Sequence, residues 1–370
     1  MSDLVLALTR CLAPFDLDIA VPHLQPLIQP GVRVARTRLP TTQWPELFQS
    51  ISTQVQAHHE KQGSGGHVVK RKPIMEREQM VVPQGPLQLT KGVVYYDIGE
   101  YLTQEVLPES LLPLGTSRLG GQPDLPVGYS WPTWDNPGKY GRTAGQGVQL
   151  SFLGQLNLRD LQAQVPTPEL PAQGLLLFFF DIENEPWGFD PSDQPAHRVI
   201  FVPQGQALQR QLCPDVEGCL IPAAVRFEPE LTFPNLDEST IDWAAAGVDA
   251  QAIDWYEVGE AVRPLRPDRP RHHVLGTACQ VQQRSMAAEC ELVSRSFNVG
   301  DDDGWAQGMA APEVAQGIAN WRLLLQFDSE DTDDGLGAMW GDCGLLYFWI
   351  EKQKLAQQDF TDTCAILQSS

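Results

Sequence analysis

Short apolar runs of strand length recur along the chain beyond residue 140. The strongest of them, Leu-Leu-Leu-Phe-Phe-Phe, lies inside the segment 174–182. Apolar runs of this length, bounded by Gly, Pro or polar residues, are typical of strands that are buried in a sheet. We therefore predict strands at Gln149–Gln155, Gly174–Ile182, Val199–Val202, Arg226–Phe233, Trp321–Phe327, Gly344–Ile350 and Thr363–Leu367.

Helical periodicity is confined to a few segments. Between Trp44 and His59, apolar residues recur at spacings of three and four, which predicts an amphipathic helix. Further helices are expected at Asp249–Val262 and Lys352–Gln358. The Gly-rich, basic stretch 63–73 is typical of a linker, and Val93–Ile98 is typical of a strand. No apolar stretch approaches the roughly 18 residues that a membrane span needs.

Two pairs of strands echo each other. Leu150–Leu158 is followed by Gly174–Asp181, and Trp321–Glu330 is followed at similar spacing by Gly344–Ile350. In both pairs the first strand carries a Gln, at positions 155 and 326, and a Gly opens the second strand. The pattern predicts an internal duplication with two related halves, at about 111–262 and 272–370.

Several separated motifs carry a family resemblance. They are LGGQPDLPVGYSWP (119–132), LSFLGQLNL (150–158), GLLLFFFD (174–181), LLLQFDSED (323–331), MWGDCGLLYFWI (339–350) and DFTDTCAILQ (359–368). In this order they resemble the YwqG-like family of bacterial proteins of unknown function, over about residues 111–368. The resemblance implies an α+β fold with a large mixed, folded-over β-sheet, flanking helices and an internal duplication. Its members often lie among toxin and antitoxin genes, which implies a binding or immunity role.

The resemblance also divides the chain. Residues 111–370 are expected to form a self-contained domain, and residues 1–110 an N-terminal extension of unknown role. The first 16 residues show no pattern of an export signal, so we expect a cytoplasmic protein whose seven cysteines are free thiols.

Net charge narrows the set of partners. The chain carries 26 basic and 47 acidic side chains, a net charge of −21. Because a field of that sign repels phosphate groups, nucleic acids and anionic membranes are not expected to bind. A basic protein partner is favoured, and solubility alone is the other explanation of the charge.

Signatures of common enzyme classes are missing from the sequence. It contains no GxxxxGK[ST] phosphate loop, no HExxH metal motif and no GxSxG nucleophile elbow. We therefore predict no catalytic residue and no nucleotide cofactor.

The most distinctive polar feature is an acidic loop after residue 327. It contains Asp328, Glu330, Asp331, Asp333 and Asp334, and Asp342 follows shortly afterwards. Such a loop is either a solvated turn, an acidic surface for a basic partner, or a Ca²⁺ or Mg²⁺ site built from oxygen ligands. An EF-hand register starting at Glu330 fails, because its third position is Thr332 and its twelfth is Gly341.

Trp131 and Trp340 lie in turn-like segments, where a large ring either packs into the core or lines a cleft. Taken together, these features predict a cytoplasmic, non-enzymatic binding protein that neutralises a toxin or regulates a partner through its acidic loop, with the two tryptophans as cleft candidates. The alternative is a cation-dependent hydrolase or metal-binding protein that uses the same loop.

Overall fold

The computed structural model describes residues 2–37, 113–211, 213–214, 220, 223–237, 241–266, 270–330 and 337–369. The helix predicted at Trp44–His59, the linker and the strand predicted at Val93–Ile98 lie outside these residues. The described α-helices are α1 (Ser2–Leu12), α2 (Val21–Leu24), α5 (Leu158–Gln164), α6 (Trp255–Val262), α7 (Met286–Ser294), α8 (Asp302–Met309), α9 (Pro312–Ile318) and α10 (Lys352–Ala356). The described strands are β1 (Gln29–Thr37), β2 (Arg118–Leu119), β3 (Asp124–Pro126), β4 (Thr133–Asn136), β5 (Gly145–Gln149), β6 (Ser151–Asn157), β7 (Leu175–Phe180), β8 (His197–Val202), β9 (Leu208–Arg210), β10 (Ala223–Thr232), β11 (His273–Leu275), β12 (Trp321–Asp328), β13 (Leu345–Glu351) and β14 (Thr363–Gln368).

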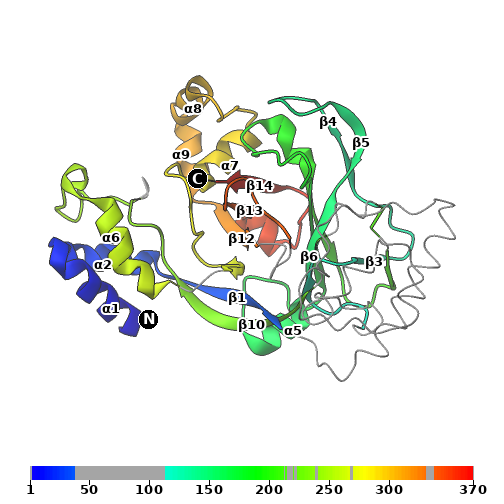
Figure 1. Cartoon of the computed structure of the whole chain (residues 1–370), viewed down its shortest axis with the longest axis horizontal. Coiled ribbons are helices and arrows are strands. Elements are labelled where there is room, and N and C mark those ends of the chain that lie inside the picture. Colours follow the sequence, from blue (N-terminus) through cyan, green and yellow to red (C-terminus); the bar gives the residue numbers. More distant parts are fainter. Residues whose placement is uncertain are drawn as a thin grey trace, which may run out of the picture.

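One sheet dominates the part of the chain that the structure describes. Ten strands follow the order β14-β13-β12-β11-β1-β10-β2-β6-β7-β8, and the sheet is strongly curved (Figure 1). The α+β class is confirmed, but every neighbouring pair among these strands is antiparallel, where the resemblance implied a mixed sheet. Strands β6, β7 and β8 follow one another in the chain and in the sheet, as do β12, β13 and β14, so direct return connections make them antiparallel.

Strand β7 is apolar along its whole length, and β13 is apolar up to Ile350, because both faces of each strand are covered. Alternate residues of a strand point to opposite faces of the sheet. On β7, the Leu176, Phe178 and Phe180 side chains enter the main core, and the intervening ones enter a second cluster around Trp134. On β13, the Phe348 side chain belongs to the main core, 5.2 Å from the Phe178 ring between centroids. The main core therefore lies between the two halves of the folded-over sheet.

The two halves of the sheet repeat each other strand by strand. Strands β2-β6-β7-β8 form one arm and β11-β12-β13-β14 the other, with β10 and β1 between them. The pairing of β6 with β7 shifts between Phe152 and Gly154, and the pairing of β12 with β13 shifts at the corresponding place, between Leu323 and Leu325. The two arms thus share a bulge at the corresponding position, and the internal duplication stays a prediction.

Matching hydrogen bonds mark the two glutamines that the sequence singled out. The Gln155 side-chain oxygen accepts from the Asp124 N–H at 2.9 Å, and its nitrogen donates to the Thr116 carbonyl at 2.9 Å. The Gln326 side chain does the same with the Cys279 N–H at 3.0 Å and the Arg271 carbonyl at 2.7 Å. Each buried glutamine thus fastens the loop that follows the neighbouring short strand, and both are structural.

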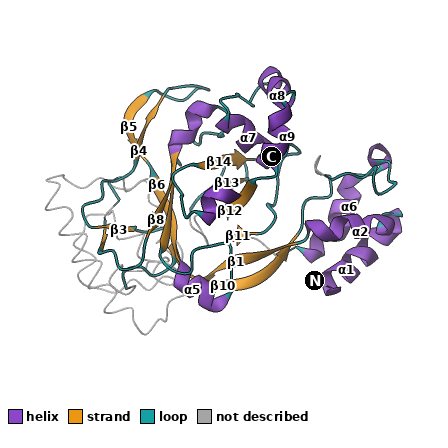
Figure 2. Ribbon diagram, turned by 180° about the vertical axis from the view of Figure 1, so that it is seen from behind, coloured by secondary structure: helices purple, strands orange, loops and turns teal. Residues whose placement is uncertain are grey.

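Helices cover the outside of the sheet. The residues Met286 and Cys290 of α7 pack with Leu345, Tyr347 and Cys364 in a cluster on the outer face of β12, β13 and β14. Helices α1, α2 and α6 gather at the far end of β1 and β10 around a separate cluster that includes Trp243 (Figure 2). Within the described ranges, no helix combines the length and the apolar character needed to cross a membrane.

The N-terminal residues are part of this sheet. Strand β1 pairs with β10 over nine residues, from Gln29 opposite Thr232 to Thr37 opposite Ala224, and with β11 on its other side. The boundary predicted at residue 111 stays a prediction, but a central strand of the sheet comes from before it.

Candidate functional site

Two members of the predicted acidic loop are buried in ion pairs and hydrogen bonds. Asp328 is fully buried, and its carboxylate accepts from the Arg271 main-chain N–H at 2.9 Å. The Glu330 carboxylate accepts from His272 Nε2 at 2.6 Å. The Asp328 N–H donates to Nδ1 of the same imidazole at 3.1 Å, so Nε2 carries the proton. Asp328 and Glu330 therefore fasten the 271–272 segment to β12.

Of the other predicted loop carboxylates, the structure describes that of Asp342. Asp342 is exposed in the turn before β13, and Asp331, Asp333 and Asp334 lie outside the described residues. Within the described ranges, no group of three or more His, Cys, Asp or Glu side chains has a geometry that could hold a metal ion.

The two tryptophan candidates are packed into the protein. Trp340 is 1% exposed, meets the Phe180 ring edge to face at 5.9 Å and donates from Nε1 to the Asp328 carbonyl. Trp131 is half-buried and donates from Nε1 to the Leu150 carbonyl at 2.8 Å. They stabilise the two arms separately, and neither lines the pocket described next.

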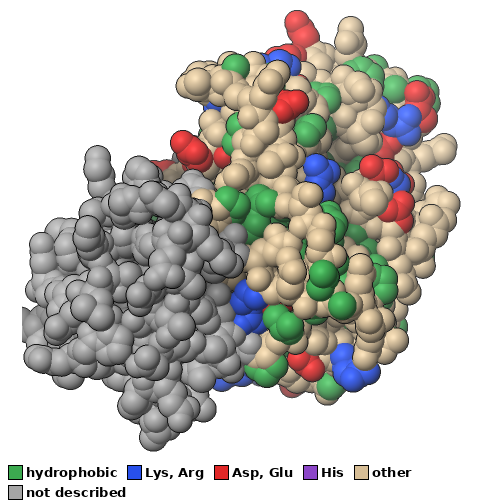
Figure 3. All heavy atoms as spheres, turned by 90° about the vertical axis from the view of Figure 1, so that its right-hand side faces the viewer, with side chains coloured by type: hydrophobic (Ala, Val, Ile, Leu, Met, Phe, Trp, Pro, Cys, Tyr) green, Lys and Arg blue, Asp and Glu red, His purple; other side chains and the backbone are tan. Residues whose placement is uncertain are grey.

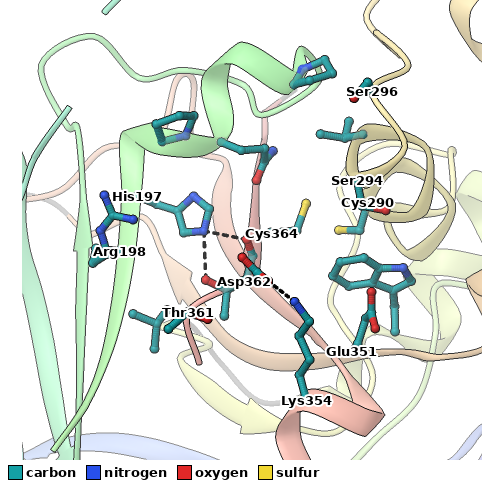
Figure 4. Close-up of a pocket in the computed structure, with 17 residues that line it drawn as sticks. His197, Arg198, Cys290, Ser294, Ser296, Glu351, Lys354, Thr361, Asp362 and Cys364 are labelled. Carbon is teal, nitrogen blue, oxygen red and sulfur yellow. Dashed lines mark hydrogen bonds and ion pairs between the residues drawn. The ribbon is translucent and has the colours of Figure 1, made fainter. Parts of the chain in front are cut away.

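A pocket of about 600 Å³ lies where the two end strands of the sheet approach each other (Figure 4). Figure 4 shows β8 on one side, α7 on the opposite side and α10 below. Its labelled side chains come from segments that are distant in sequence: His197 and Arg198 from β8, Cys290 and Ser294 from α7, Glu351 and Lys354 around the start of α10, and Asp362 and Cys364 from β14 and its approach. A volume of this size suits a small ligand or a short peptide.

His197 joins the two end strands across the wall of the pocket. Its Nε2 lies 3.0 Å from both the carbonyl and the hydroxyl oxygen of Thr363, the first residue of β14. Because a carbonyl can only accept, Nε2 is the protonated nitrogen. Burial lowers the pKa of His197 to about 4, so the ring is neutral at physiological pH. The imidazole therefore acts as a fixed link between β8 and β14.

Two thiols face the pocket from opposite elements. Cys290 is on α7 and Cys364 is on β14, both are buried, and neither forms a disulfide. Burial, together with the neighbouring Cys364 thiol, raises the pKa of the Cys290 thiol. A thiol with a raised pKa is a poor nucleophile, because the thiolate is the reactive form. The nearby Ser294 hydroxyl donates to the Glu291 carbonyl at 2.7 Å.

Charged groups line the mouth of the pocket. Lys354 forms an ion pair with Asp362, whose side chain is largely exposed. Arg198 is half-buried and lies on the side of β8 away from His197 (Figure 4), and no carboxylate of the described residues lies within ion-pair distance of it. Its guanidinium can therefore meet an anion beside β8, but it does not point into the pocket. The Thr363 hydroxyl contacts His197 through Nε2, the nitrogen that already carries the proton and so cannot accept one, and the arrangement therefore suits binding better than acyl transfer.

The sequence did not predict this pocket. Its walls come from positions that are far apart in the chain, and motif spacing does not report such contacts. His197 and Thr363 hold equivalent places in the two arms, opposite Phe180 and Ile350 at the starts of β8 and β14. Equivalence in a repeat does not report contact, so it gives no signal of the pocket.

Comparison with known proteins identifies a family and no activity. A search of curated proteins found no match. A family model matches residues 117–369, which is more than half of the chain and contains both arms of the sheet. This match is compatible with the YwqG-like resemblance of the sequence motifs. The chain therefore belongs to the family described as domain of unknown function DUF1963.

Proposed function

We propose that this protein is a non-enzymatic binding protein whose ligand site is the pocket between β8, β14 and α7. The observation that carries the proposal is the state of the reactive side chains in that pocket. His197 is neutral and bonded to Thr363, and the Cys290 thiol has a raised pKa. Groups held in this way shape and line a pocket, but none is activated for chemistry.

The net charge supports a basic protein as the partner. A charge of −21 steers basic surfaces towards the molecule and raises the association rate at low salt. Acidic and basic side chains are interspersed on the face shown in Figure 3, so this steering there comes from the summed charge and not from one acidic patch. A cytoplasmic regulatory or toxin-neutralising role remains part of the proposal, supported by the resemblance alone.

A pair of variants tests where the partner binds. Ser294→Trp places a large ring at the pocket wall from an exposed helix end, and the matched control changes Asp331, Asp333 and Asp334 to Asn. Wild-type protein and both variants are used to isolate partners from the native cells. We expect the same partner with wild type and with the triple variant, and its loss with Ser294→Trp. Loss with the triple variant alone would move the binding surface to the acidic loop.

A further inference from the structure

The two end strands of the sheet differ in how their outer edges are used. The Asp181 N–H donates to the Ala196 carbonyl at 3.0 Å. These two residues are opposite each other in the register of β7 and β8, so they form a hydrogen-bonded pair. In an antiparallel pair, bonded and non-bonded residue pairs alternate. Val199 and Phe201 therefore turn their main-chain N–H and C=O groups away from β7. On β14, the same alternation turns the main-chain N–H and C=O groups of Ala365 and Leu367 away from β13.

On β14 the outward groups are already occupied. Residues 187–194, called here the strap, run along this edge. The Leu367 N–H donates to the Trp187 carbonyl at 3.1 Å, and the Ala365 N–H donates to Gln194 Oε1 at 3.3 Å. Gly188 has a φ of +81°, and a Cβ there would lie 1.9 Å from the Ala365 carbonyl oxygen. The strap is thus built for contact with the strand edge.

On β8 the corresponding groups are open. No described residue accepts from or donates to the outward main-chain groups of Val199 and Phe201. The cause is the unequal length of matching connections. The connection 181–196 of the first arm contains the strap, but the connection of the second arm has only residues 352–362, which fold into α10 and its following turn. The shorter connection packs the Phe360 ring on Phe201 at 5.3 Å and, among the described residues, gives no main-chain partner to the outward groups of β8.

We propose, building on the binding function above, that the open edge of β8 pairs with an extended peptide of a partner protein, and that this peptide carries an acidic side chain for Arg198. The strap shows on the matching strand what such an edge accepts: a main-chain carbonyl and a carboxamide. Addition of a strand to an exposed edge is a general mode of peptide recognition. The unpaired Arg198 guanidinium supplies the charge that selects a carboxylate.

The shape of the pocket favours one strand over a second copy of this chain. Val199 lines the pocket, and α7 forms the opposite wall with Cys290 and Ser294 (Figure 4). A single extended segment fits between a strand edge and a helix, whereas a neighbouring sheet does not. A dimer formed through β8 is therefore an outcome of the test that would contradict the proposal.

Two proline variants at matching positions test the edges themselves. Val199→Pro removes an outward N–H that bonds to nothing among the described residues, and proline is tolerated at such edge positions. Ala365→Pro removes the N–H that donates to Gln194. Both side chains are buried in the main core, so each proline also changes core packing. Val199→Ala loses the core contacts but keeps the N–H, and we expect Val199→Pro to melt no lower than Val199→Ala, whereas Ala365→Pro should melt several degrees below Ala365→Gly. A Val199→Pro variant that melts several degrees below Val199→Ala would show that the edge of β8 is not open.

A phage-displayed library of random short peptides then serves as the probe for binding. We expect enriched peptides to contain an acidic residue, and to bind Val199→Pro and Arg198→Gln about tenfold more weakly than wild type. Methylation of alternate main-chain nitrogens of the peptide should abolish binding. In the complex, hydrogen exchange of the Val199 amide should slow.

The failures are distinguishable. Absence of any enriched peptide, equal binding to wild type and Val199→Pro, or a dimer that Val199→Pro dissociates would each overturn the strand-pairing proposal. A peptide that is lost with Ser294→Trp but kept with Val199→Pro would leave the pocket as the binding site and remove only the pairing with β8. A peptide that binds both variants as tightly as wild type would count against the pocket as the binding site as well.

Discussion

One buried acid, Glu289, makes the stability of this protein depend on pH. Glu289 lies on α7, is 2% exposed, and its Oε2 has no hydrogen-bond partner among the described residues. Burial raises the pKa of Glu289 to about 8, since a charge without partners is costly in an apolar surrounding. The folded protein therefore holds a proton there at neutral pH, and the unfolded chain releases it.

We expect the free energy of unfolding to fall as pH rises from the usual glutamate pKa of 4.5 towards 8, because the unfolded state binds fewer protons over that range. Glu289→Gln keeps the shape and removes the titration. Its stability relative to wild type should rise by about 1.4 kcal/mol per pH unit between these limits. Denaturant unfolding at several pH values measures the slope. Glu313→Gln, at an exposed position on α9, is the control and should run parallel to wild type.

At the scale of elements, strand β1 joins the two arms. It bonds β10 on one side and β11 on the other, and its Val32 and Val34 side chains belong to the main core. Without it, β10 and β11 each lose a neighbour, and two open strand edges appear in the centre of the sheet. Exposed central edges promote aggregation.

A fragment of residues 111–370 should therefore lose its cooperative thermal transition or aggregate, although its family-like motifs are complete. Circular dichroism during heating and light scattering measure the two outcomes. A separate peptide of residues 1–37, added during refolding, should restore at least part of the transition by supplying β1 with α1 and α2. A fragment as stable as the whole chain would show that residues 1–110 are dispensable for folding.

Strands buried on both faces were the most predictable elements. Continuous apolar runs placed β7, β12, β13 and β14 within a residue or two of their observed bounds. Strand β1 escaped prediction because its sequence, QPGVRVART, mixes Pro, Gly and Arg with few apolar residues. Helix α7 escaped because Glu289 and Glu291 are buried on it and break any apolar stripe.

The candidate site was less predictable than the fold, for a physical reason. The acidic loop stood out as a cluster in sequence, yet Asp328 and Glu330 are bonded to Arg271 and His272 in the interior. The pocket depends on where the ends of a curved sheet meet, which is a property of the assembled arms. No local pattern near His197 or Cys364 reports that meeting.

Over the whole molecule, the excess of negative charge raises the question of bound cations. Asp328 and Glu330 already bond to Arg271 and His272, so their carboxylates are engaged. Ca²⁺ takes about six to eight oxygen ligands, and the loss of these two carboxylates weakens the case for a cation site in the loop.

We expect millimolar Ca²⁺ or Mg²⁺ to leave the thermal unfolding temperature unchanged, both in wild type and in the variant with Asp331, Asp333 and Asp334 changed to Asn. The variant should be equally stable or slightly more stable, as repulsion is relieved. An ion at a hundred times its dissociation constant would add about 2.7 kcal/mol. A rise of that size in wild type alone would establish a cation site in the loop.

The central place of β1 also has a consequence for folding during synthesis. Its partners β10 and β11 end at Thr232 and Leu275, so the ribosome must add more than half of the chain before β1 can pair on both sides. Contacts between such distant residues slow folding, and partly folded chains with open edges are prone to misassembly. Until then, at least one edge of β1 stays unpaired. Nascent chains of this protein should therefore depend on chaperones until residue 275 has emerged.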